Sequence, residues 1–308
     1  MAGLRVGILG AGGVGIATAG ALIQQGLVGR LTIYDRTAER AEGEALDYLH
    51  ALPLLPNAEI RGLGIDCIEP EDVLVVTVGH HTKPGESRLD TLEHNIAVMA
   101  ETATAIERGG LPRIVIVVSN PLDVLTEYLT RRWAGQPVSI MGSGTSLDTL
   151  RFTERIAREC SVHPRSVHAW VVGEHGDSAV FLFDAITIGA LPLQAYAGQR
   201  DLNVSAEWRT AVELDVRGAA YRVRELKGST SHGIGLAVGG LIRCIGRETG
   251  TVIPVSVRVG DNVCASLPCA LGPDGASAPL WPPMSADETA CWNRSLDVLR
   301  QANEALPF

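Results

Sequence analysis

The stretch Leu4-Arg-Val-Gly-Ile-Leu-Gly10-Ala-Gly12-Gly13-Val-Gly15 decides the fold of this chain. Its apolar first half, residues 4–9, predicts a buried β-strand, and the glycines that follow match GxGxxG at the start of a predicted helix, residues 14–25. In this motif the first glycine allows a tight turn, the second lets the backbone approach a pyrophosphate, and the third lets the helix pack closely on the strand. The helix N-terminus then faces the phosphates. The residues predicted to form this dinucleotide site are Gly10, Gly12, Gly13, Val14 and Gly15.

An acidic residue follows at the spacing that the dinucleotide motif requires. The next predicted strand, residues 31–34, leads directly to Asp35, twenty residues after Gly15. A carboxylate there can accept hydrogen bonds from the ribose hydroxyls of adenosine and would repel a 2′-phosphate, so the predicted cofactor is NAD rather than NADP. The neighbouring Arg36 weakens this inference, because an arginine can tolerate the phosphate. The alternative is a glycine turn that binds no nucleotide, with Asp35 as a surface residue.

Two patterns of secondary structure divide the chain. Residues 37–52 have helical composition, and continuous apolar runs at 73–78 and 114–119, with a shorter one at 138–141, predict central parallel strands. This alternation predicts an α/β fold with an N-terminal Rossmann domain, a doubly wound parallel sheet, over residues 1–143. Residues 144–308 predict an α+β domain that binds the substrate. Its expected helices are 146–160, 206–227, one from near 234 and 286–306, and its expected strands are 167–172, 185–188, 252–259 and 264–271.

Composition excludes several classes of function. The net charge of −9 argues against a protein that binds nucleic acid through a basic face. No apolar run reaches the roughly 18 residues that span a bilayer, and the N-terminus lacks the layout of a signal peptide. The six cysteines form no CxxC pair, which favours reduced thiols in a cytoplasmic protein and argues against a zinc site. We therefore expect no metal, no membrane and no nucleic acid among its partners.

Two segments contain candidate catalytic residues. Asp148 and Arg151 are three apart on a predicted helix, so they share a face. His175 lies in Val172-Gly-Glu-His175-Gly-Asp-Ser178, a polar glycine-rich turn after a predicted strand. Taken alone, such a histidine is usually structural, and such an Asp–Arg pair is usually a weak surface ion pair. Asn120, before Pro121, ends another strand at the carboxyl edge of the sheet, and it is a candidate for contacting nicotinamide ribose or substrate.

In combination, these motifs resemble the L-lactate/malate dehydrogenase family over nearly the whole chain. The family's order is matched by the glycine loop, Lys83-Pro-Gly-Glu-Ser-Arg88, Ser119-Asn-Pro121, the Asp148/Arg151 segment, Gly173-Glu-His-Gly-Asp177 and Lys227-Gly-Ser-Thr230. The resemblance implies an NAD-dependent L-2-hydroxy-acid dehydrogenase that transfers a hydride reversibly between NADH and a small 2-oxo acid. It also implies a homodimer or homotetramer.

The resemblance assigns roles residue by residue. His175 matches the histidine that protonates the 2-oxo group, and imidazole suits this role because its ordinary pKa lies near operating pH. Asp148 matches the carboxylate that orients this imidazole, and Arg151 matches the arginine that binds the substrate carboxylate with two parallel hydrogen bonds. Arg88 matches the arginine that polarises the carbonyl from a mobile loop, and Thr230 matches a residue lining the pocket.

One substrate-binding position departs from the family. Thr82 stands where lactate dehydrogenases place Gln and malate dehydrogenases place Arg. Because threonine is uncharged and shorter, it argues against simple malate dehydrogenase activity and favours a non-standard 2-oxo acid, with pyruvate as a slow substrate. The adjacent His80, His81 and Lys83 either contact the substrate or point to solvent. Two alternatives remain: a malate dehydrogenase, and a non-catalytic NAD-binding sensor or scaffold of the same fold.

Overall fold

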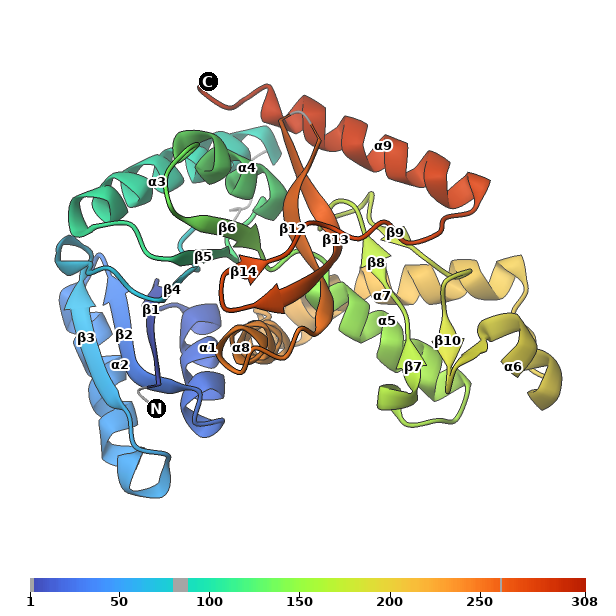
Figure 1. Cartoon of the computed structure of the whole chain (residues 1–308), viewed down its shortest axis with the longest axis horizontal. Coiled ribbons are helices and arrows are strands. Elements are labelled where there is room, and N and C mark those ends of the chain that lie inside the picture. The colour runs from blue at the N-terminus through green and yellow to red at the C-terminus, as the bar shows by residue number, and fades with distance from the viewer. Residues whose placement is uncertain (1–2, 80–87, 261) are drawn as a thin grey trace.

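The computed structural model describes residues 3–79, 88–260 and 262–308, and Figure 1 shows the arrangement of the elements in these segments. One sheet dominates the fold, and helices cover both of its faces. In the described part of the chain its nine strands are ordered β14 (Gly275–Ala276), β13 (Val263–Gly272), β12 (Val252–Gly260), β6 (Ser139–Gly142), β5 (Ile114–Val117), β4 (Val73–Val76), β1 (Leu4–Leu9), β2 (Val28–Asp35) and β3 (Glu59–Gly64).

The six strands from β1 to β6 are parallel, and their order creates a crevice. The chain runs from β1 through β2 to β3 on one side, then crosses back to β4 and continues through β5 to β6 on the other. In open sheets of this kind ligands bind where the strand order reverses, outside the carboxyl ends of the strands. Here that point lies between β1 and β4. This topology confirms the predicted doubly wound Rossmann sheet.

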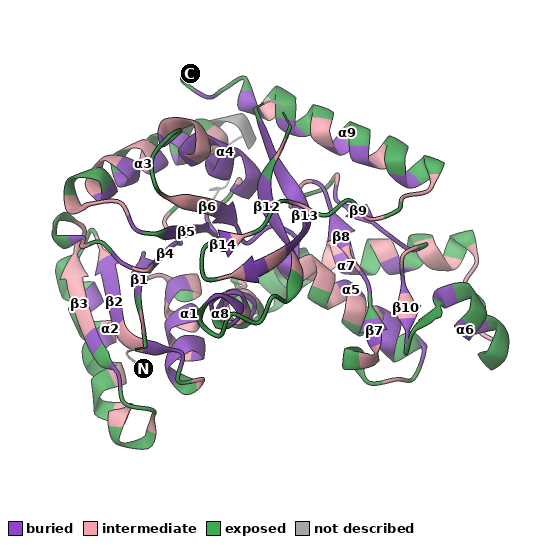
Figure 2. Ribbon diagram, viewed as in Figure 1, coloured by how far each residue is buried: buried purple, intermediate pink, exposed green. Residues whose placement is uncertain are grey.

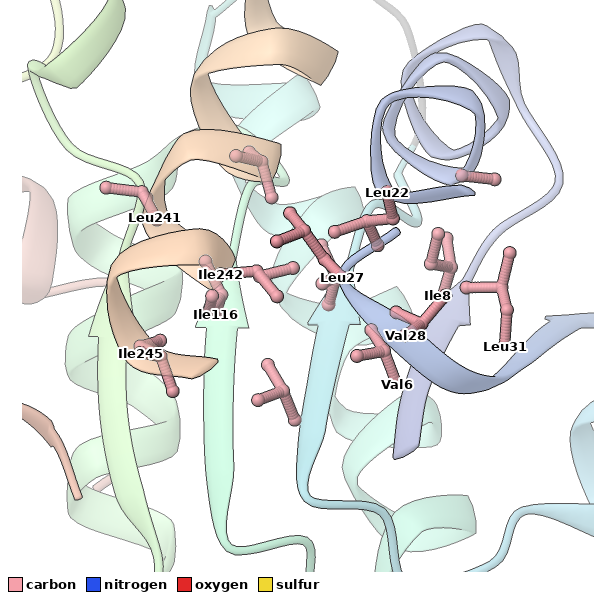
Figure 3. Close-up of a cluster of buried hydrophobic side chains, with 14 of the residues drawn as sticks. Val6, Ile8, Leu22, Leu27, Val28, Leu31, Ile116, Leu241, Ile242 and Ile245 are labelled. Atoms are coloured by element: carbon pink, nitrogen blue, oxygen red, sulfur yellow. The ribbon is translucent and has the colours of Figure 1, made fainter. Parts of the chain in front are cut away.

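Alternating residues of the parallel strands face two separate cores. Ile8 belongs to a cluster with α1 (Gly13–Gln24), α2 (Ala38–Ala51) and α8 (His232–Gly246). The next residue, Leu9, belongs to a cluster with α3 (Arg88–Gly109) and α4 (Leu122–Arg132). This follows from the period of two in a strand, which sends successive side chains to opposite faces. Figure 3 shows the first cluster, in which Ile8, Ile116 and Ile242 come from β1, β5 and α8.

The rest of the chain forms a smaller α+β unit with its own core. Its core includes residues of α5 (Ser146–Glu159), α6 (Leu193–Arg200) and α7 (Ala206–Lys227), whereas α9 (Ala286–Asn303) packs against β13 in a separate cluster. Short strands make one sheet of β11 (Leu191–Pro192), β10 (Thr187–Ile188) and β7 (Val167–His168), and another of β8 (Val171–Val172) and β9 (Val180–Phe181). The Phe152 ring packs edge-on against Phe181 and Phe183, with centroids 5.1 Å apart in both pairs. The described residues also form 3₁₀ turns at Leu52–Leu54, Ile65–Cys67 and Pro164–Ser166.

Burial distinguishes the central strands from the outer helices. Figure 2 shows the central strands of the large sheet mostly buried, whereas α2 and α9 carry exposed residues along their outer faces. None of the helices in the described residues is both long enough and apolar enough to cross a membrane. Residues 167–172, expected to form one strand, are divided between β7 and β8, which belong to different sheets.

Candidate active site

The glycine loop lies at the carboxyl end of β1, beside the crevice. Gly10 has a φ of +111°, and its N–H donates to the Tyr34 carbonyl at the end of β2. A Cβ at Gly15 would lie 2.0 Å from the Gly10 carbonyl oxygen, so α1 can approach the loop this closely only with glycine there. A Cβ at Gly12 would meet nothing within 4 Å. The space at Gly12 and the uncapped N-terminus of α1 therefore suit a pyrophosphate.

Asp35 joins the glycine loop to the end of β2. Its Oδ2 accepts the Ala11 N–H at 2.8 Å, and its Oδ1 accepts the Thr37 N–H at 3.0 Å. The carboxylate is half-buried and Arg36 is exposed. Since carboxylate oxygens can accept more than one hydrogen bond, Asp35 can hold the loop and still receive ribose hydroxyls. The residues present therefore fit a dinucleotide that lacks a 2′-phosphate.

Three predicted catalytic and binding residues meet at the N-terminal end of α5. Asp148, in its first turn, accepts from His175 Nδ1 at 2.7 Å through Oδ2 and from Arg151 Nη1 at 3.0 Å through Oδ1. The side chains of His175, Asp148 and Arg151 are 24%, 15% and 21% exposed. Because an ionised carboxylate only accepts, Nδ1 carries a proton and Nε2 is left for proton exchange. Arg151 keeps donors that Asp148 does not use, and these can bind an anion.

The electrostatics of this cluster favour a protonated histidine. Burial opposes the charged imidazole, but the Asp148 carboxylate outweighs it, so the pKa of His175 is raised above its ordinary value. Burial alone would raise the pKa of Asp148, because it disfavours the ionised carboxylate. The charges and hydrogen bonds of His175 and Arg151 overcome it, so the pKa of Asp148 is lowered. The pair is therefore an ionised carboxylate beside an imidazole whose protonated form it favours.

Several elements hold the turn that contains His175, through residues that the sequence did not reveal. Gly173 forms a two-way backbone bridge to Ser266 of β13. The Glu174 N–H donates to Ser295 Oγ of α9 at 2.8 Å. Arg217 of α7 donates to the carbonyl oxygens of Asp177 and Ala179, both at 2.6 Å. No local sequence pattern marks Ser266, Ser295 or Arg217, because their contacts arise only in the tertiary fold.

Asp123 is another residue that contacts the His175 turn and that was not expected from the sequence. It lies in the first turn of α4, and its Oδ2 accepts the His175 peptide N–H at 2.7 Å. Its Oδ1 accepts the Ser256 hydroxyl at 2.6 Å. A weak signal was present, since Asp123 stands three residues after Asn120 in a segment already singled out.

The remaining predicted residues are placed less completely. Asn120 is exposed beyond the carboxyl end of β5, on the same edge of the sheet as the glycine loop, and Thr230 is half-buried just before α8. Arg88 is the first residue of α3, and its side chain lies outside the described structure. Thr82 and its neighbours His80, His81 and Lys83 also lie outside the described residues.

Comparison with known families covers almost the whole chain. Residues 4–142 match the family described as lactate/malate dehydrogenase, NAD binding domain. Residues 145–306 match its companion, the lactate/malate dehydrogenase alpha/beta C-terminal domain.

Individual relatives agree with the family match. The chain is 36% identical to an L-lactate dehydrogenase of Thermus aquaticus over 99% of this chain and 100% of that protein. It is also 36% identical to an L-lactate dehydrogenase of a Synechococcus strain, over 98% of this chain and 99% of that protein. Among solved structures, a minor L-lactate dehydrogenase of Enterococcus mundtii superposes with a TM-score of 0.93 at 29% identity, with both chains fully covered.

Proposed function

This chain belongs to the lactate/malate dehydrogenase family, and from that premise we propose that His175, Asp148 and Arg151 carry its reaction. At the level of the family it is an NAD-dependent oxidoreductase that acts on the CH–OH group of a 2-hydroxy acid. The observation that supports the proposed site is one carboxylate shared by two groups. Asp148 binds the imidazole of His175 at 2.7 Å and the guanidinium of Arg151 at 3.0 Å.

This arrangement suits the chemistry of a 2-oxo acid. Bound NADH supplies the hydride that reaches the carbonyl carbon. His175 Nε2 gives its proton to the carbonyl oxygen, and in the reverse direction it removes the hydroxyl proton. Arg151 binds the substrate carboxylate with its remaining donors, which fixes the carbonyl relative to the imidazole. By resemblance, Arg88 polarises the carbonyl and Thr230 lines the pocket.

The cofactor is NAD, which the N-terminal family match supports. We propose that it is held by Gly10, Gly12, Gly13, Val14 and Gly15, with Asn120 beside the nicotinamide ribose or the substrate. Asp35 would accept the adenosine ribose hydroxyls and so disfavour NADP. Its hydrogen bond from the Ala11 N–H places it directly beside the glycine loop, which supports this assignment.

The preferred substrate is proposed to be a 2-oxo acid bulkier than pyruvate. This rests on Thr82, which is shorter than the glutamine of lactate dehydrogenases and lacks the charge of the arginine in malate dehydrogenases. An uncharged residue gives the second carboxylate of oxaloacetate no partner at this position. Malate dehydrogenase activity is therefore the weaker alternative, and pyruvate is expected to be a slow substrate.

The test is a survey of NADH oxidation across 2-oxo acids that differ in size and charge. We expect at least one bulky 2-oxo acid to exceed pyruvate in kcat/KM, and oxaloacetate to be poor. His175→Ala should lose nearly all turnover, by about 10²-fold or more, while binding NADH almost normally. An active His175→Ala protein would refute the assignment. If the wild type binds NADH but reduces none of the acids, the chain is the non-catalytic alternative.

The family resemblance also implies a homodimer or homotetramer, and one surface supports this proposal. A groove of about 420 Å³ lies among α5, α7 and α8, and Arg151 is part of its lining. Leu150 and Leu236 line the same groove, and they are 53% and 61% exposed. Large apolar side chains gathered around a groove are typical of a surface that another subunit covers.

A further inference from the structure

Asp123 is a buried carboxylate that the proposed reaction does not use. It is 3% exposed and accepts two hydrogen bonds, from the His175 peptide N–H and from the Ser256 hydroxyl. Both donors are neutral. Burial raises the pKa of Asp123 to about 6, against the lowering effect of these two hydrogen bonds. A carboxylate is a costly group to bury in such surroundings unless its charge serves another group.

A second buried carboxylate on the same helix shows what is unusual about Asp123. Glu127, one turn further along α4, is fully buried, but it pairs with Arg131 at 2.8 Å and with Arg258 at 2.6 Å. Among the described residues, no lysine or arginine forms an ion pair with Asp123. Asp123 instead accepts from the peptide N–H of His175, and the imidazole of the same residue interacts electrostatically with its carboxylate.

We propose that Asp123 is a positioning residue for His175. Its carboxylate fixes the turn through the His175 peptide N–H. Its charge favours the protonated imidazole, in addition to the carboxylate of Asp148 at Nδ1. This inference rests on the proposed role of His175 as the proton donor. The charged groups that act on the His175 imidazole are Asp148 and Arg151 of α5 and Asp123 of α4, while the adjacent Glu174 acts on Asp123.

The same hydrogen bond connects two separate segments of the candidate site. Asp123 lies in the segment that begins with Asn120, the candidate contact for nicotinamide ribose or substrate, whereas His175 follows β8. The hydrogen bond between Asp123 and the His175 peptide therefore ties the carboxyl edge of the parallel sheet to the proton donor.

The experiment is an NMR titration of the His175 ring in Asp123→Asn and in the wild type. The ring signal is identified by its absence from His175→Gln. Asparagine can still accept the peptide N–H and can donate to Ser256 Oγ, so this variant removes mainly the charge. We expect the pKa of His175 to fall by at least about half a unit. With an active substrate, the decline of reductive kcat/KM at high pH should move down by the same amount. An unchanged pKa in Asp123→Asn would overturn the proposal.

Two further variants keep the result interpretable. Glu127→Gln neutralises a buried carboxylate on the same helix, and it should leave the pKa of His175 unchanged even if it lowers stability. A shift as large as that of Asp123→Asn would mean that general loosening of α4 is responsible. Ser256→Ala serves if Asp123→Asn does not fold. It removes the 2.6 Å donor, makes Asp123 harder to ionise, and should lower the pKa of His175 by a smaller amount. An unchanged pKa of His175 in Ser256→Ala would contradict the proposal.

Failure of this inference is distinguishable from failure of the proposed function. The NMR titration needs no substrate, so it reports on Asp123 even if the wild type reduces none of the 2-oxo acids. Conversely, if the wild type is active and the pKa of His175 is unchanged in Asp123→Asn, the dehydrogenase assignment stands and only the role of Asp123 is refuted.

Discussion

At the scale of single residues, the site depends on Asp148 having two neighbours. One of its oxygens orients the His175 imidazole, and the other holds Arg151 Nη1. This geometry fixes the proposed proton donor and the proposed anion-binding group relative to each other before a substrate arrives. Such preorganisation lowers the cost of reaching a reactive arrangement. It also means that a change in either neighbour has a distinct kinetic signature.

Replacing Arg151 with lysine should weaken substrate binding far more than it weakens NADH binding. A single ammonium cannot reproduce two parallel hydrogen bonds to a carboxylate, so we expect KM for the 2-oxo acid to rise about tenfold or more. Steady-state kinetics measure KM, and fluorescence titration measures NADH affinity, which should change little. Arg155→Lys is the matched control, because Arg155 lies one turn along α5 and pairs with Asp215. An unchanged KM in Arg151→Lys would remove its proposed role.

The sequence could predict these residues only to the extent that their neighbours are local. Asp148 and Arg151 share a helical face at a spacing of three, and the structure places them in contact. The proximity of His175 to Asp148 was expected from family resemblance rather than from spacing. Asp123 could not be assigned, because its link to His175 crosses 52 positions and exists only once α4 meets the turn after β8.

At the scale of elements, the packing of α8 on α1 joins the C-terminal half of the chain to the helix that begins at the glycine loop. A Cβ at Gly235 would lie 2.6 Å from the Ala17 carbonyl carbon, so the two helices approach closely only with glycine at this position. Side chains from both helices then share one core with the parallel strands. Because α1 begins at the glycine loop, its distance from α8 sets the position of the loop.

Gly235→Ala should therefore destabilise the protein, although alanine is normally the better helix former. We expect a loss of about 1–3 kcal/mol in the free energy of unfolding, from overpacking against α1, together with weaker NADH binding. Gly240→Ala is the control on the same helix, since a Cβ there meets nothing within 4 Å. It should be neutral or stabilise by up to about 1 kcal/mol. Urea unfolding measures both variants, and equal effects would contradict the packing argument.

Element-level predictions succeeded where the hydrophobic period was strong and local. Residues 206–227 were expected to be helical, and α7 spans Ala206–Lys227. The stretch 167–172 was expected to be one strand, but its two halves pair with different partners. Pairing partners lie far away in sequence, so a short apolar run cannot indicate how it is divided. A strand at 252–259 was expected and forms β12, but the same limit hid its antiparallel pairing with the parallel sheet through Ser256 and Gly142.

At the scale of the whole molecule, one sheet links segments that match two different family domains. Residues 4–142 supply the parallel strands β1 to β6, and the hairpin of β12 and β13 within residues 145–306 extends the same sheet. The two halves are therefore joined by backbone hydrogen bonds as well as by the packing of α8 on α1. The groove that contains Arg151 lies on the outside of this joined body, so a second subunit there would cover part of the site.

Association through this groove is testable without changing the proposed catalytic residues. Leu236 is 61% exposed on α8, and Leu236→Glu would place a carboxylate in the proposed contact. A charge that is buried in a subunit contact without a partner costs several kcal/mol, because it loses its hydration. We therefore expect association to weaken by about tenfold or more. Sedimentation velocity across a concentration series should show a dimer or tetramer for the wild type and a shift toward monomer for the variant. Val298→Glu, at an exposed position on α9, is the matched control and should not shift. A monomeric wild type, or equal behaviour of both variants, would place any contact elsewhere.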